Sequence, residues 1–152
     1  MSTEALTKKT NLADKFTGKW HNQHNSELDI KVDQQGRVTG IFKIEGTISN
    51  ATSEEFPVCG FIANDVIGFC VAFEKHNCVT SWTGQIAKIS EDQFKETVHT
   101  LWHMSVQVGK QAENSLWKSV LSGADVFERG PRSSERNTLR TTPSHPLWMN
   151  AT

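Results

Sequence analysis

The chain has 152 residues, with 16 lysines and arginines against 17 aspartates and glutamates, so its formal net charge is -1 at pH 7. This length favours one domain with its own core, and the balanced charge argues against nucleic acid or an anionic membrane as a partner. No run approaches the roughly 18 apolar residues of a transmembrane helix. No signal peptide is visible, so a secreted and a cytoplasmic location both stay open.

The chain has three cysteines, and an odd number in a chain of this length does not indicate a disulfide framework. No CxxC motif occurs, and the six histidines show no metal-ligand spacing relative to cysteine or aspartate. The sequence therefore predicts no metal site and no bound cofactor.

The two ends of the chain differ from its middle. Residues 1–15 are polar without alternation, and residues 130–152 hold three of the four prolines among many polar residues. Such segments cannot bury enough apolar area to fold alone. We expect a flexible N-terminal segment over 1–15, a folded domain over 16–129 and a disordered tail over 130–152.

Between these ends the apolar residues recur with a period of two, which predicts strands. Turn signals separate the runs at 34–36, 64–65, 75–77, 90–92 and from 109 onward, and only 112–118 has a helical pattern. Short strands at this regular spacing predict an all-β protein, here an eight-stranded antiparallel up-and-down β-barrel, which closes its own edges and can hold one small ligand. In chain order the expected strands are 19–24, 28–32, 38–44, 56–62, 67–73, 80–86, 100–106 and 121–127.

The same alternation places polar side chains on the inner face, beside aromatic ones. Buried polar groups need partners, and a buried carboxylate needs them most. They either satisfy one another and ordered water, or they line a small-molecule pocket of the usual aromatic kind. The inward set comprises Asn22, Ser26, Thr80 and Asp125 with Phe73, Trp82 and Trp102.

Over about residues 17–129 the chain resembles the avidin and streptavidin family. The motifs that carry the resemblance are ordered as in that family, and the most specific is Thr80-Ser81-Trp82-Thr83-Gly84-Gln85. The others are Gly18-Lys19-Trp20-His21-Asn22-Gln23, Val38-Thr39-Gly40, Thr100-Leu101-Trp102, and Trp117-Lys118-Ser119 followed by Gly123-Ala124-Asp125-Val126-Phe127. The resemblance implies a barrel that binds biotin without catalysis, and a defensive role through sequestration of that vitamin.

The resemblance also implies roles for single residues. Asn22 and Ser26 should contact the ureido oxygen, Asp125 should accept from a ureido N–H, and Thr80 should meet the thioether sulfur. Trp82, Trp102 and Phe73 should surround the rings and the valeryl chain, while Trp117 should cover the ligand of a neighbouring subunit. The implied biotin-binding set is Asn22, Ser26, Phe42, Ile44, Thr47, Phe73, Cys78, Thr80, Trp82, Trp102, Trp117 and Asp125.

Four positions depart from the family's pattern. Phe42 stands where a ureido-binding Tyr is usual, and Ile44 replaces a polar acceptor; Phe73 replaces a common Trp, and Cys78 a Ser. A lost hydrogen bond costs about 0.5–1.5 kcal/mol, and more when a buried ligand atom stays unpaired. We therefore expect biotin affinity to be about two to four powers of ten below that of the tightest members.

The loop over 45–55 should lie above the pocket mouth. Thr47, Ser49 and Asn50 are the side chains there that could hold a ligand carboxylate, and the sequence does not choose among them.

Asn64-Asp65 predicts a two-residue hairpin turn, which places Cys59 opposite Cys70 on the outer face. Their Cα separation of about 5.5 Å permits a disulfide, but two reduced thiols at a subunit interface are favoured because nothing indicates an oxidising compartment. Dimeric family members place a cysteine further ahead of the sixth-strand Trp than Cys78 stands. Together with Trp117, this favours a homotetramer.

Three other interpretations compete with biotin binding. A lipocalin-like carrier would share the Gly-x-Trp opening but not Asn22, Ser26 and the sixth-strand motif. An enzyme is disfavoured because no nucleophile motif occurs. An avidin-like scaffold that has lost biotin, or binds another ligand, is the serious competitor because of Phe42 and Ile44.

Overall fold

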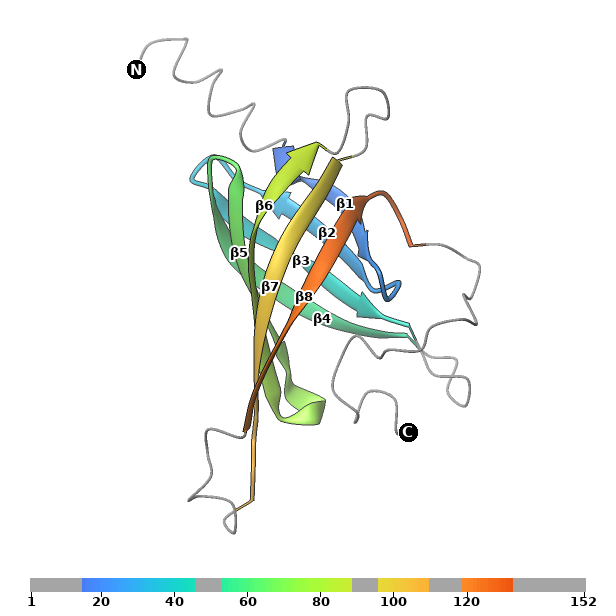
Figure 1. Cartoon of the computed structure of the whole chain (residues 1–152), viewed down its shortest axis with the longest axis vertical. Helices are drawn as coiled ribbons and strands as arrows, with labels where there is room; N and C mark the ends of the chain where they lie inside the picture. The colour runs from blue at the N-terminus through green and yellow to red at the C-terminus, as the bar shows by residue number, and fades with distance from the viewer. Residues whose placement is uncertain (1–14, 46–52, 89–95, 110–118, 133–152) are drawn as a thin grey trace.

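The computed structural model of the chain describes residues 15–45, 53–88, 96–109 and 119–132 (Figure 1). The predicted helical turn over 112–118 and the predicted turn at 90–92 lie outside these ranges. So do most of the two end segments, and the predicted domain boundaries therefore stay predictions.

The described residues form a closed antiparallel β-barrel in which each strand pairs with the next and β1 pairs with β8. This confirms the predicted fold class. A 3-10 helix, η1 (Glu74–His76), joins β5 to β6. The strands are β1 Gly18–Asn22, β2 Glu27–Val32, β3 Arg37–Ile44, β4 Glu54–Ala63, β5 Val66–Phe73, β6 Cys78–Lys88, β7 Glu96–Val106 and β8 Val120–Arg129.

Three asparagines shape the connections between strands. Asn25, Asn64 and Asn77 have φ values of 62°, 54° and 53°, in the left-handed region that Asn tolerates better than most residues. The turn at Asn64 pairs Ala63 with Val66, and the register continues as predicted to Cys59 opposite Cys70.

Burial alternates along the strands as the period of two predicts. On β5, Val71 and Phe73 are buried whereas Cys70 and Ala72 are exposed. Leu121 shares the inward parity of Asp125 on β8 but is 43% exposed, because β8 pairs with β1 only over its last residues and its beginning lies beside β7 alone.

One end of the barrel is closed by side chains. The Trp20 indole N–H donates to the Phe16 carbonyl at 2.7 Å, and the Arg129 guanidinium lies 4.2 Å over the Trp20 ring. The cavity left there, beside Phe16, Trp20 and Phe127, holds about 10 Å³, too little for an organic ligand. Any ligand inside the barrel must therefore enter from the opposite end.

Candidate functional site

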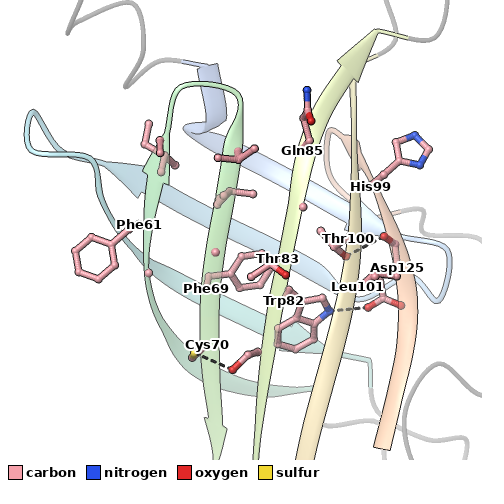
Figure 2. Close-up of a pocket in the computed structure, with 18 of the residues that line it drawn as sticks. Phe61, Phe69, Cys70, Trp82, Thr83, Gln85, His99, Thr100, Leu101 and Asp125 are labelled. Carbon is pink, nitrogen blue, oxygen red and sulfur yellow. Dashed lines mark hydrogen bonds between the residues drawn. The ribbon is translucent and has the colours of Figure 1, made fainter.

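A buried carboxylate, that of Asp125, lies on the inner wall of β8 and is only 1% exposed. Its Oδ2 accepts from the Trp82 indole N–H at 2.8 Å, which Figure 2 shows, and from Asn22 Nδ2 at 3.4 Å. Its Oδ1 accepts from Gln23 Nε2 at 3.1 Å. Residues from β1, β6 and β8 thus converge on one carboxylate, as the inward parity of Asn22, Trp82 and Asp125 predicts.

Burial raises the pKa of the Asp125 carboxyl above its ordinary value, because a charged group loses solvation inside the barrel. The hydrogen bonds from Trp82, Asn22 and Gln23 act in the opposite direction. The carboxylate is thus held in an environment that favours any further hydrogen-bond donor.

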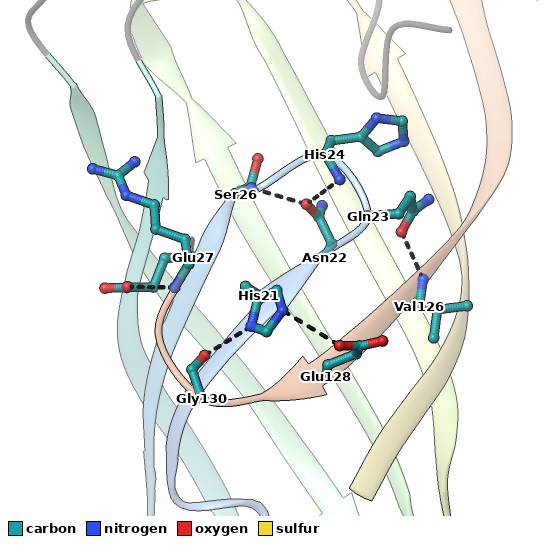
Figure 3. Close-up of polar contacts among 10 residues, drawn as sticks. His21, Asn22, Gln23, His24, Ser26, Glu27, Val126, Glu128 and Gly130 are labelled. Atoms are coloured by element: carbon teal, nitrogen blue, oxygen red, sulfur yellow. Dashed lines mark hydrogen bonds and ion pairs between the residues drawn. The ribbon is translucent and has the colours of Figure 1, made fainter. Parts of the chain in front are cut away.

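The turn from β1 to β2 holds Asn22 in place (Figure 3). Asn22 Oδ1 accepts from the backbone amides of Ser26 at 2.9 Å and His24 at 3.1 Å. The side-chain oxygen is thereby occupied, and the NH2 group is the part of Asn22 that faces Asp125. An amide NH2 group has two N–H donors, and the hydrogen bond to Asp125 uses one of them.

The indole of Trp82 is held between two rings. Phe69 stacks on it at 5.1 Å with a 13° interplanar angle, and Phe42 lies 5.2 Å away at 34°. Trp102 on β7 is the register partner of Trp82 on β6 and of Gly123 on β8. A Cβ on Gly123 would come within 2.4 Å of Trp102 Cζ2, so this glycine gives the indole its space.

The interior next to Trp82 is strongly apolar. Phe42 contacts Phe73 edge-on at 6.0 Å, and Phe56 contacts Phe73 at 4.7 Å. Ile44 is half-buried and packs against the same core. Phe42 and Ile44 thus occupy, with apolar atoms only, the wall where the family resemblance expects two polar groups.

Two inward residues of β6, Thr80 and Cys78, place polar groups in this apolar interior. The Thr80 hydroxyl is buried, and no hydrogen-bond partner for it exists among the described residues. Cys78 is also buried, and burial raises the pKa of its thiol to about 11, so it stays protonated at neutral pH. An unpaired buried hydroxyl costs about 1–3 kcal/mol, which a ligand atom could recover.

Ten of the twelve predicted site residues lie in the described ranges, and each is buried or half-buried. Thr47 and Trp117 lie outside those ranges, as do Ser49 and Asn50. The ten are Asn22, Ser26, Phe42, Ile44, Phe73, Cys78, Thr80, Trp82, Trp102 and Asp125.

The predicted site left out two groups around Asp125. Gln23 lies one residue past Asn22 and so has outward parity, yet its amide reaches both the Asp125 carboxylate and the Val126 backbone N–H. The Thr100 hydroxyl donates to the Asp125 carbonyl at 2.9 Å. Thr100 has the same strand parity as Trp102, and this alternation could have identified it as an inward residue.

Within the described ranges, no three His, Cys, Asp or Glu side chains group closely enough to hold a metal ion. No helix in the same ranges has the length and apolar character to cross a membrane.

Comparison with known proteins shows that this chain is similar to avidins in both sequence and structure. The model of the Avidin family matches residues 10–130. The crystal structure of xenavidin is 27% identical with a TM-score of 0.62, over 78% of this chain and 99% of that one. A phenylalanine-to-alanine variant of shwanavidin in complex with biotin is 26% identical with a TM-score of 0.60, over 75% and 96%. Rhizavidin, at 21% identity and a TM-score of 0.61 over 86% and 93%, supports the fold alone.

The raised pKa of Asp125 makes stability depend on pH. A folded-state pKa above the unfolded-state value stabilises the fold at low pH, and this contribution is lost as pH rises through the raised pKa. We expect Asp125→Asn to increase the free energy of unfolding at neutral pH, with a gain that disappears as the solution is acidified. Thermal unfolding across that pH range measures it.

Glu74→Gln is the matched control, since Glu74 is exposed on η1. It should show no such pH-dependent gain. A lower midpoint for Asp125→Asn than for wild type at neutral pH would contradict the expectation.

Proposed function

The chain belongs to the avidin family, and we propose on this premise that it binds biotin inside the barrel and performs no catalysis. The observation that carries the proposal is the buried Asp125 carboxylate, which accepts hydrogen bonds from three side chains, those of Asn22, Gln23 and Trp82. A carboxylate without a cationic partner in an apolar interior is unfavourable for packing alone. A ligand with N–H donors explains it.

The proposal pairs three polar groups of biotin with side chains of this barrel: one ureido N–H, the ureido oxygen and the thioether sulfur. Asp125 accepts from a ureido N–H, and the Asn22 NH2 group, with Ser26 beside it, donates to the ureido oxygen. The Thr80 hydroxyl, unpaired among the described residues, meets the thioether sulfur. The apolar faces of the fused rings lie against Trp82, Trp102 and Phe73.

Phe42 sets the limit on affinity in this proposal. Its ring lies 5.2 Å from Trp82 and 6.0 Å from Phe73, so it covers an aromatic surface that the ligand also needs. It offers no hydroxyl to the ureido oxygen. Binding therefore forgoes one hydrogen bond, which places the affinity below the family's tightest.

The competing proposal is an avidin-like barrel that has lost biotin and binds another ligand or acts as a scaffold. The packing of aromatic rings in the interior supports it. Phe42, Phe56 and Phe73 pack together in the interior and could fill it as a core does. Titration with biotin separates the two proposals. If biotin binds tightly without turnover, sequestration of the vitamin follows, and a defensive role is the hypothesis consistent with it.

Calorimetric titration with biotin tests the function, with displacement of a biotin-site dye as a second readout. Wild type should bind one biotin per chain. Asp125→Ala should weaken binding by about one to two powers of ten, because hydrogen bonds to charged groups contribute about 1.5–3 kcal/mol. Asp29→Ala, a carboxylate of β2 with outward parity, is the matched control and should bind as wild type. No heat and no displacement at high micromolar biotin would remove the biotin proposal.

Phe42→Tyr tests the account of the weakened site. The added hydroxyl should reach the ureido oxygen and lower the dissociation constant about two- to ten-fold, the effect of one hydrogen bond worth about 0.5–1.5 kcal/mol. Phe56→Tyr, which adds the same atom to the neighbouring ring, is the comparison. An unchanged or higher dissociation constant in Phe42→Tyr would show that this wall does not face the ureido group.

We further propose that copies of this chain assemble into a homotetramer in which Trp117 covers a neighbour's ligand. The outer surface of β4 to β8 forms a shallow concavity of about 1190 Å³, shown in Figure 2. Phe61 and Leu101 are each 64% exposed on it, and Val66 is 45% exposed. Large apolar patches on a soluble protein favour a protein partner.

Light scattering after size exclusion tests assembly. Leu101→Glu should reduce the mass of the assembly, because it places a charge on the apolar surface. Gln35→Glu, which adds the same charge on the exposed β2–β3 turn, should leave the mass unchanged. A wild-type mass equal to one chain would contradict the proposal.

A further inference from the structure

The outer face of the β4–β5 hairpin brings two thiols opposite each other. Cys59 and Cys70 are register partners, both exposed and both free, and both border the concave outer surface. Opposed Cα atoms of an antiparallel pair lie about 4.5–5.5 Å apart, within the roughly 4.4–6.8 Å that a disulfide spans. The register thus gives the two cysteines a Cα separation that a disulfide can span.

We propose that Cys59 and Cys70 form a reversible redox pair that closes to an intrachain disulfide across β4 and β5 in the presence of a low-molecular-weight disulfide such as oxidised glutathione. This inference is independent of biotin, because both side chains lie on the outer face of the barrel.

The third cysteine shows by contrast why this pair is the reactive one. Cys78 is buried on the inner face, and its thiol is kept protonated by a pKa of about 11. Buried protonated thiols are poor nucleophiles, whereas exposed ones react. The fold therefore separates one inert thiol from two accessible ones.

The surroundings of Cys70 also suit the reaction. Ser81, the register partner of Cys70 on β6, places its Oγ 3.1 Å from the Cys70 sulfur (Figure 2). The register continues this row across the sheet on both sides. His103 on β7 pairs with Ser81, and Thr39 on β3 pairs with Cys59. The row contains no carboxylate, so nothing in it repels an incoming thiolate or the anionic glutathione molecule.

The reaction balances as two thiol–disulfide exchanges. One cysteine thiolate attacks a sulfur of oxidised glutathione, which forms a mixed disulfide and releases one glutathione thiolate. The facing cysteine loses its proton to solvent and attacks the protein sulfur of that mixed disulfide, which releases the second thiolate. The protein loses two electrons and two protons, and one oxidised glutathione becomes two reduced ones.

The resulting bond joins strands whose register is already set by the Asn64 turn. It closes a short loop and restricts the unfolded chain, which stabilises the folded state. The concave surface is the one proposed above to contact other copies of the chain. The pair is therefore oxidised and reduced in the chain before assembly, while this surface is open to solvent.

Refolding of the full chain in glutathione buffers from fully reduced to fully oxidised tests the proposal. After denaturation and alkylation, mass spectrometry should show chains with one alkylated cysteine, Cys78, and peptide mapping should find Cys59 joined to Cys70. The oxidised form should unfold about 5–10 °C higher than the reduced form. Cys59→Ser and Cys70→Ser should each abolish this species, and Cys78→Ser should retain it.

Three alkylated cysteines in every buffer, including oxidised glutathione alone, would overturn the proposal. Disulfides that join two chains or include Cys78 would overturn it as well. Biotin titration of the oxidised and reduced forms keeps the two proposals distinct, since loss of biotin binding would leave the mass result unchanged.

Discussion

The buried carboxylate of Asp125 is the constraint on which the rest of the site depends. It accepts from Trp82 on β6 and from Asn22 at the end of β1, and these residues are far apart in sequence. They meet because β1 and β8 close the barrel, with Asn22 opposite Phe127 in register. Closure of the sheet therefore completes the polar site: a barrel that failed to join β1 to β8 would leave the carboxylate with Trp82 but without Asn22 and Gln23.

The interior combines elements that a simple core would avoid. The inner face carries a desolvated carboxylate, a Thr80 hydroxyl without a partner among the described residues, and an indole that stacks on Phe69 and donates to Asp125. Each lowers stability or restricts motion, and under the proposed function each would be positioned in advance for the ligand. Preorganisation of this kind reduces the ordering cost of binding. Phe42 acts against it, because the ligand must share the surface of Trp82 with this ring.

Much of this arrangement was predictable from the sequence because a strand has a period of two. Parity alone placed Asn22, Thr80 and Asp125 inside, and the Asn64 turn set Cys59 opposite Cys70. Parity could not predict the role of Gln23, because that residue lies where β1 ends and the backbone leaves the strand. Nor could it show how the Phe42 ring packs on Trp82, since ring orientation depends on neighbours from several strands. Leu121 follows its predicted parity but is exposed, because burial also requires a paired strand on each side.

The most direct test of the central claim is the nuclear magnetic resonance signal of the Trp82 indole N–H, assigned with a Trp82→Phe variant, during addition of biotin. This proton is donated to Asp125 at 2.8 Å, so it reports any new donor that the carboxylate accepts. The account predicts a saturable shift complete at one biotin per chain, together with a shift of the Asn22 side-chain amide. Signals of both groups that stay unchanged at saturating biotin would contradict it.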